Sequence, residues 1–182
     1  MNIKTLASCF FGLAISLCLC ACAQSGATIT SNKLNAYSGA PKRMLIFADL
    51  GNDLAHRANG DGTAVFEADF TGSLNNCGIV TEYHAKDWLT LQDERAAAIK
   101  SFSPDAILEI QWKTEQDMRD GQRTNYLAAI YDVKTQRLVW KADINLELRW
   151  FAGETLAAVV IDNLKKQAII DSSCVTPKVP KV

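Results

Sequence analysis

Two histidines and the acidic residues around them are the side chains of this chain that could bind a metal or transfer a proton. His56 and His84 each have carboxylates within five positions along the sequence. Neither spacing matches an HExxH motif or a compact Cys/His zinc pattern, in which three or four ligands converge. We therefore expect both histidines to be solvated loop residues, and we expect neither a metal centre nor another cofactor.

A second polar group follows an early apolar run. Asp49 comes directly after the apolar residues 44–48, and Asp53 and Asp61 lie further along. In an open α/β sheet, ligands bind at the carboxyl ends of the strands, where these carboxylates would lie. However, the sequence at 60–62 is Gly-Asp-Gly, which is neither a GxGxxG motif nor a P-loop with its lysine. A turn followed by a helix N-cap is the favoured interpretation.

The sequence lacks signals for an enzyme or for a nucleic-acid-binding protein. It has no GxSxG motif, no Cys-His pairing and no pair of carboxylates with a stated reason to converge. The 19 Lys and Arg residues against 20 Asp and Glu residues give a net charge of −1. No basic block suits nucleic acid or an anionic membrane surface. We therefore predict a protein that is not an enzyme and that does not bind nucleic acid.

The N-terminus has the parts of a secretory signal peptide. Lys4 is followed by an apolar stretch over 9–20. The sequence at 19–22 is Leu-Cys-Ala-Cys, which resembles the lipobox of bacterial lipoproteins. This resemblance implies that residues 1–21 are removed and that Cys22 carries lipid. It also implies sorting to the outer membrane, because Ala23 rather than Asp follows the lipidated cysteine.

Two alternatives stay open for this terminus. Cleavage after Ala21 or Ala23 would give a simply secreted protein, and an uncleaved segment would serve as a membrane anchor. The lipoprotein is favoured. It predicts a chain that is lipid-anchored in the outer membrane, with its domain facing the periplasm.

The six cysteines divide into two groups. Four of them lie in the signal peptide or at the lipidation position. Cys77 and Cys174 are left in the mature chain, and a single pair in an oxidising compartment favours a disulfide. That bond would close a loop of about 97 residues, long enough to stabilise the fold substantially. The alternative is two free, partly buried thiols.

The mature chain divides into a tether, one domain and a tail. Residues 22–42 are rich in Ser, Thr, Gly, Ala and Asn and are expected to form a flexible tether. Within it, Tyr37 could contact a partner or pack on its own domain. The folded domain is expected over 43–173, and a disordered tail over 174–182.

Hydrophobic periodicity predicts the elements of the domain. The clearest alternation runs over 138–149, where the even-numbered residues from Leu138 onward share one face. Over 61–77 the apolar residues recur at helical spacing, with Asp61 or Thr63 as the N-cap and Gly78 as the stop. The expected strands are 44–48, 79–83, 106–112, 125–133 and 138–149, the expected helices are 61–77, 91–102 and 153–170, and 115–123 is expected to be a hairpin loop.

The order β-α-β-α-β-β-β-α predicts an α/β domain with one five-stranded mixed sheet. Helical crossovers join the first three strands, which should be parallel, and the last three should form an antiparallel meander. Right-handed crossovers give the strand order 2-1-3-4-5. We expect helices mainly on one face of the sheet. The other face should be at least partly solvated and is the expected partner surface.

The four tryptophans divide by context. Trp112 and Trp140 lie on apolar strand faces and are expected in the core. Trp88, Trp150 and Phe151 lie outside the expected strands, and aromatic residues are favoured at interfaces. These three residues are candidate partner-binding residues, with packing at the edge of the core as the alternative.

This element order behind a lipobox resembles small outer-membrane lipoproteins such as the penicillin-binding-protein activator LpoB. It is also similar to the N-terminal domain of TolB and to the CsgG-like group. The residues that carry the resemblance are 44–48, 74–80, 104–108 and 132–140. It covers most of 43–170 and implies a similar fold and a role in binding envelope proteins. It implies no particular functional residue.

Two functions follow as hypotheses. The favoured one is a non-enzymatic envelope lipoprotein that binds or helps assemble another envelope component, with an envelope protein as its partner. The alternative is a periplasmic binding module for a small molecule or a glycan at the ends of the parallel strands.

Overall fold

The structure of the protein is a computed structural model. It describes residues 26–37, 39–51, 54, 61–85, 92–118, 121–148 and 151–180. The expected signal peptide and Cys22 lie outside these residues. No helix in the described ranges is long and apolar enough to cross a membrane.

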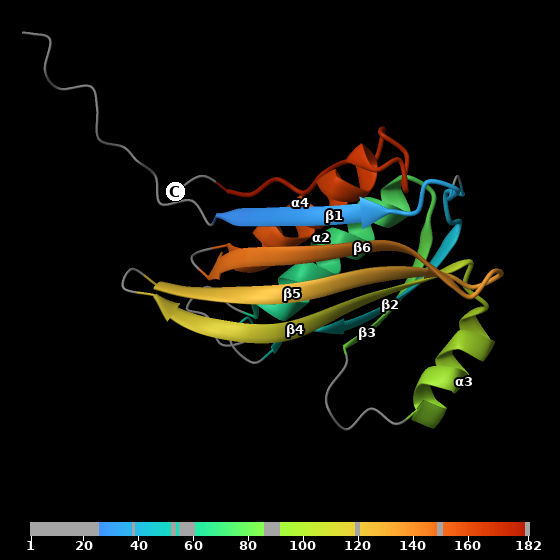
Figure 1. The fold of residues 1–182 in the computed structure, drawn as a ribbon, viewed down its shortest axis with the longest axis horizontal. Coiled ribbons are helices and arrows are strands. Elements are labelled where there is room, and N and C mark those ends of the chain that lie inside the picture. The colour runs from blue at the N-terminus through green and yellow to red at the C-terminus, as the bar shows by residue number, and fades with distance from the viewer. Residues whose placement is uncertain are drawn as a thin grey trace, which may run out of the picture.

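The expected strands and helices are present, with shifted ends, and one further strand precedes them (Figure 1). In chain order the elements are β1 (Ala27–Lys33), β2 (Arg43–Asp49), α2 (Gly62–Asn76), β3 (Val80–Ala85), α3 (Gln92–Phe102), β4 (Ala106–Met118), β5 (Gly121–Asp132), β6 (Arg137–Leu148) and α4 (Ala152–Lys166).

One mixed sheet of six strands forms the centre of the domain. Its order is β1-β6-β5-β4-β2-β3. Strand β2 pairs in parallel with β3 and β4, and the remaining neighbours are antiparallel. The five expected strands follow one another in the predicted order, and β1 extends the sheet beyond β6. The expected strand count and complete order therefore need correction by one edge strand.

Strand β1 lies inside the range 22–42, which we expected to be a tether. All its residues pair with β6, from Ala27 opposite Leu146 to Lys33 opposite Trp140. Its composition is polar, and only Ala27 and Ile29 pack against the main core. The strand forms because β6 offers a row of backbone groups at its edge, and this long-range pairing leaves little trace in the local sequence.

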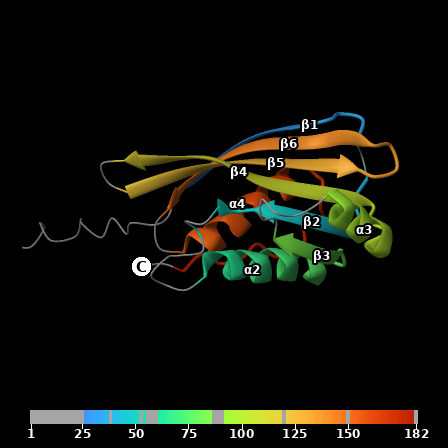
Figure 2. The same ribbon diagram turned by 90° about the horizontal axis from the view of Figure 1, so that it is seen from below.

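The helices lie on both faces of the sheet. Figure 2 shows α2 and α4 in a layer beneath β1, β6 and β5. Helix α3 packs on the opposite face, over β2 and β4, through Ala98 and Phe102. Two right-handed crossovers that leave β2 and β3 in opposite directions place α2 and α3 on opposite faces.

Strand β2 is buried on both faces, because helices cover the sheet on both sides of it. Met44, Ile46 and Ala48 belong to the main core under α2 and α4, whereas Leu45 and Phe47 belong to a second, smaller core under α3. A strand between two packed layers reads as a continuous apolar run rather than as an alternating one.

Two local expectations about the antiparallel strands are wrong. Residues 115–118 and 121–123 lie in strands rather than in a loop, because β4 continues to Met118 and β5 begins at Gly121. Leu138 does not share the buried face of β6: a register shift between Ile130 and Tyr131 leaves Leu138 exposed and buries Val139 instead. Cross-strand pairing decides both features, since a bulge changes the face that each later residue occupies.

Helices α2 and α4 contact each other closely at their first turns. Asp61 caps α2 by accepting hydrogen bonds from Thr63 N (2.9 Å) and Ala64 N (3.3 Å). A side chain on Gly153 would overlap the carbonyl oxygen of Gly62, and one on Gly62 would lie 2.6 Å from the Leu54 carbonyl oxygen. Both positions therefore require glycine.

The disulfide Cys77–Cys174 joins the end of α2 to the chain that follows α4, with the two Cα atoms 5.0 Å apart. Cys174 lies in the main core, although we expected position 174 to begin a disordered tail. The described part of the tail is held by Lys165 Nζ, which donates to the Cys174 carbonyl oxygen (2.7 Å), and by Thr176 Oγ1, which donates to Asp162 Oδ1 (2.5 Å). Backbone hydrogen bonding and the disulfide order this segment despite its composition.

Candidate functional site

The expected site residues divide between described and undescribed parts of the chain. Cys22, Trp88 and Trp150 lie outside the described residues. Phe151 is described and partly exposed, directly before α4, with a φ of 62°. Its carbonyl oxygen accepts hydrogen bonds from Thr155 N (2.9 Å) and Thr155 Oγ1 (2.7 Å). A left-handed backbone is unusual for an aromatic residue, so the start of α4 holds Phe151 in place against this preference.

A charged and aromatic cluster lies where α3 crosses the parallel strands. We call Phe47, Glu82, His84, Arg95 and Glu109 the α3 cluster. Phe47 lies opposite His84 on one neighbouring strand and opposite Glu109 on the other. The guanidinium of Arg95 lies 4.7 Å from the centre of the Phe47 ring and pairs with Glu109. The cluster thus joins three strands to α3 near the carboxyl ends of β2 and β3, where ligands bind in open α/β sheets.

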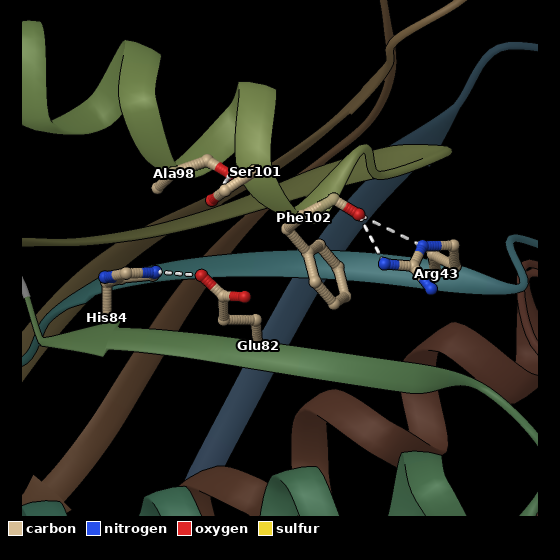
Figure 3. Close-up of polar contacts among 6 residues, drawn as sticks. All are labelled: Arg43, Glu82, His84, Ala98, Ser101 and Phe102. Atoms are coloured by element: carbon tan, nitrogen blue, oxygen red, sulfur yellow. Dashed lines mark hydrogen bonds and ion pairs between the residues drawn. The ribbon is translucent and has the colours of Figure 1, made fainter.

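His84 and Glu82 form the solvent-accessible side of this cluster. The two side chains project from β3 toward α3, with Nε2 of His84 2.7 Å from Oε1 of Glu82 (Figure 3). Their side chains are 38% and 37% exposed. His84 was expected in a solvated loop, but it lies in a strand, with its ring 5.5 Å from that of Phe47. The pair can donate hydrogen bonds to a bound molecule and accept hydrogen bonds from it.

Metal binding receives no support from the described ranges. They contain no group of three or more His, Cys, Asp and Glu side chains that could hold an ion. Asp49 accepts a hydrogen bond from Gly51 N (3.2 Å) in a turn, and Asp61 is the helix cap. Asp53 and His56 lie outside the described residues.

Arg43 joins the other end of α3 to β2. Its Nε donates to the carbonyl oxygens of Phe102 (3.1 Å) and Ser103 (3.2 Å), and its guanidinium lies 4.4 Å from the centre of the Phe102 ring (Figure 3). Asp105 accepts hydrogen bonds from the backbone N–H groups of Lys42 and Arg43, each at 3.0 Å. The hydrogen bonds from Arg43 satisfy carbonyl groups at the end of α3 and so position the helix over the sheet.

The aromatic residues are placed differently from one another. Trp140 is buried, and its Nε1 donates to Asn163 Oδ1 (3.2 Å), as expected for a core residue. Trp112 was also expected in the core, but it is 37% exposed. A Cβ on Gly51, which has a φ of +70°, would lie 2.8 Å from the Trp112 ring. The indole therefore lies over the turn after β2, close to the point where the register of β4 shifts.

Two tyrosines have raised pKa values. Burial is the main cause for Tyr83, and the carboxylates of Glu67 and Asp61 add to it. Its buried hydroxyl has no hydrogen-bond partner within the part of the chain that is described. Burial also raises the pKa of Tyr37, which packs on its own core. Both hydroxyls therefore stay protonated at neutral pH.

The antiparallel strands present a second surface, on the side away from α2 and α4 (Figure 2). We call this the open face. Asn145 Nδ2 donates to Asn125 Oδ1 (2.9 Å), whose own Nδ2 donates to Thr114 Oγ1 (3.0 Å). These bonds link side chains across β6, β5 and β4. The open face includes Thr28, Thr30, Asn32, Thr114, Arg123, Asn125, Leu127, Ala129, Lys141, Asp143, Asn145 and Glu147.

Comparison with known proteins gives structural similarities only. No protein-family model matches the chain, and no curated protein matches it. A PelC dodecamer from Paraburkholderia phytofirmans matches with a TM-score of 0.49 and 12% identity, over 80% of this chain and 99% of that one. The lipoprotein GNA1162 from Neisseria meningitidis matches with a TM-score of 0.38 and 15% identity, over 68% of this chain and 98% of that one.

A PDZ domain protein from Parabacteroides distasonis matches with a TM-score of 0.41 and 11% identity, over 79% of this chain and 36% of that one. The structural neighbours thus include a bacterial lipoprotein. With every one of these TM-scores below 0.5, no function follows from the likeness. The resemblance to LpoB, TolB and the CsgG-like group stays a prediction.

Proposed function

We propose that this protein is a non-enzymatic lipoprotein of the bacterial cell envelope that binds or helps assemble another envelope component. Its lipid on Cys22 anchors it in the outer membrane, with the domain in the periplasm. The observation that carries the proposal is the Leu-Cys-Ala-Cys sequence at 19–22, at the end of an apolar segment. The disulfide Cys77–Cys174 supports it, because disulfides are typical of compartments outside the cytoplasm.

The short distance from Cys22 to the first strand restricts where the domain works. Three residues separate Cys22 from Gly26, and the Gly26 carbonyl oxygen already accepts a hydrogen bond from Glu147 N (2.8 Å). An extended chain spans about 3.6 Å per residue, so this connection reaches about 14 Å at most. The sheet is therefore held at the membrane surface, and a partner has to be reachable from there.

The open face is the proposed partner surface. It carries hydroxyl, amide and charged side chains that are not covered by a described helix, and Asp143 and Lys141 are exposed on it. Polar groups that are already ordered by hydrogen bonds such as Asn145 to Asn125 can bind a partner at little cost in conformational entropy.

Lipidation is tested by replacing Cys22 with Ser in the full-length chain. We expect the variant to leave the membrane fraction, since each buried CH₂ of an acyl chain contributes about 0.8 kcal/mol to anchoring. Cys20→Ser is the matched control, because it changes a neighbouring cysteine and keeps the lipidation position. Membrane attachment of Cys22→Ser with unchanged gel mobility would show that the lipoprotein interpretation is wrong.

Partner binding is tested by a photo-crosslinking amino acid at Asp143, on the open face, in living cells. We expect a crosslinked envelope protein that can be identified by mass spectrometry. Asn76, which is exposed at the end of α2, is the control position. Equal crosslinking from both positions would contradict the assignment of the open face.

The alternative function has its own support in the α3 cluster. His84 and Glu82 offer accessible hydrogen-bonding groups near the carboxyl ends of parallel strands, which suits a small molecule or a glycan. A saturable small ligand, whose binding is lost in His84→Ala, would favour this alternative if no protein partner is found.

A further inference from the structure

The two edges of the sheet differ in how well they are protected against pairing with another chain. Strand β3 forms one edge. It carries the carboxylate of Glu82 near its middle, and charged side chains discourage strand addition. Strand β1 forms the other edge, with the sequence Ala-Thr-Ile-Thr-Ser-Asn-Lys. It has no proline, no bulge and no charge before its last residue, Lys33.

The hydrogen bonds of β1 show which backbone groups are left at this edge. Gly26 accepts from Glu147 N (2.8 Å), and Leu34 N donates to the Val139 carbonyl oxygen (2.8 Å). In an antiparallel pair, alternate residues direct both backbone groups toward the same neighbour. The even-numbered residues of β1 therefore bond to β6, and Ala27, Ile29, Ser31 and Lys33 direct their N–H and C=O groups outward.

Nothing described in the chain pairs with these outward groups. No backbone hydrogen bond among the described residues reaches β1 from any strand except β6. Figure 2 shows β1 at the margin of the strand layer, with α4 in the layer beneath it. The edge is therefore a template for one further strand.

We propose that β1 pairs antiparallel with β1 of a second copy of this chain, on a two-fold axis that passes beside Thr30. With Thr30 opposite Thr30 of the copy, Ala27 faces Lys33 and Ile29 faces Ser31. Each of these pairs joins two outward-directed residues and exchanges two hydrogen bonds. A register shift of one residue would place each outward-directed residue opposite a residue whose backbone groups already bond to β6. A shift of two residues would leave one outward-directed residue of each strand without a partner.

The side chains agree with this register. On the open face, Thr30 meets its own copy and Thr28 meets Asn32, and all of these side chains are exposed and uncharged. Cross-strand pairs of Thr with Thr or Asn can hydrogen-bond. Lys33 faces Ala27, so no like charges lie directly opposite each other. This self-complementarity is what a two-fold interface requires, because both copies contribute the same surface.

The register is tested by cysteine crosslinking in the full-length chain within membranes. Thr30→Cys should give a disulfide-linked dimer on addition of an oxidant, because facing residues that are not hydrogen-bonded to each other lie about 4.5 Å apart at their Cα atoms. Thr28→Cys alone should crosslink far less, and Thr28→Cys combined with Asn32→Cys should restore the dimer. Val80→Cys on β3 is the matched control at the opposite edge.

A charge at the axis tests the affinity. Thr30→Lys places two like charges opposite each other and should weaken the dimer by about fivefold or more in analytical ultracentrifugation. Val80→Lys should leave the dimer unchanged, and the unfolding midpoint of both variants should stay near that of the parent, since both side chains are exposed.

Three results would overturn the proposal. One is a monomeric chain that gives no Thr30→Cys dimer. Another is equal crosslinking from Thr30→Cys, Thr28→Cys and Val80→Cys, which would indicate random collision. The third is a Thr30→Cys crosslink to a different protein, which would assign the edge to another partner. A dimer linked through Cys22 in the unsubstituted chain would instead count against lipidation and leave the pairing of β1 to be decided by the Thr30 variants.

Discussion

The parallel and antiparallel parts of the sheet are built differently. Strands β3, β2 and β4 lie between α2 on one face and α3 on the other, whereas the described helices contact β5, β6 and β1 on one face only. Leu45 in the parallel part is fully buried beneath α3, while Asp143 in the antiparallel part is exposed on the open face. The parallel part is the packed half of the domain, and the antiparallel part provides its accessible surface.

This difference follows from connectivity. Parallel strands need crossover helices, and these helices cover the sheet. Antiparallel strands need only short turns, such as the one after Asp132, where Thr135 N and Thr135 Oγ1 both donate to Asp132 Oδ1 at 2.6 Å. An accessible sheet surface is therefore expected on strands that are joined by short turns rather than by crossover helices.

Removal of the disulfide should have the largest effect, because it joins the end of α2, which packs on β3, to the segment after α4, which packs on β1 and β6. Cys77→Ala combined with Cys174→Ala opens a loop with a sequence separation of 97. We expect a loss of about 4 kcal/mol in the free energy of unfolding, measured by chemical denaturation. Reduction of the unsubstituted protein should give a similar loss. A loss below about 1 kcal/mol would mean that the two parts hold together without the covalent link.

Truncation of matched leucines should separate the covered part from the open one. Leu45→Ala removes a side chain that is buried beneath α3 and should cost about 3 kcal/mol. Leu127→Ala, on the open face, should cost less than about 1 kcal/mol, because Leu127 is only partly buried. Equal losses for the two variants would show that the open face is packed like the covered one.

Glycine substitutions in the helix layer should give the smallest effects. Gly153→Ala forces a methyl group against the carbonyl oxygen of Gly62, where α4 meets α2, and should cost about 2 kcal/mol. Gly72 lies in α2, and a Cβ at this position would have no neighbouring atom within 4 Å. Gly72→Ala should therefore add about 1 kcal/mol of stability through helix propensity. Thermal unfolding measures both, and a neutral Gly153→Ala would mean that the two helices can separate without loss.

The sequence predicted those features that depend on neighbouring residues. The cap at Asp61, the stop at Gly78 and the helical spacing of Phe66, Phe70 and Leu74 lie within one helix, and all are present. The alternation over 140–146 is equally local and is preserved in β6. Such patterns are readable because a helix or strand repeats every few residues.

The features that were missed depend on residues far apart in the chain. Composition predicts a tether at Ala27–Lys33 and a loop at the end of β4. Both segments are strands, because pairing with a neighbouring strand stabilises them despite their composition. Trp112 was expected in the core, but its side chain is 37% exposed, whereas Trp140 is buried. The site around Phe47 could not be predicted either, since Arg95 reaches it from a separate helix.

The amino-acid sequence by itself determined the expected lipid anchor, the pair Cys77 and Cys174 and the order of five strands, because each depends on residue type or on local periodicity. Only the tertiary structure decided how close to Cys22 the folded domain begins. Pairing of β1 with β6 brings the fold to within three residues of Cys22. It leaves the backbone groups of Ala27, Ile29, Ser31 and Lys33 at an edge that no other described strand covers. The physical reason is that strand pairing joins groups distant in sequence, so its consequences appear only when the sheet is complete.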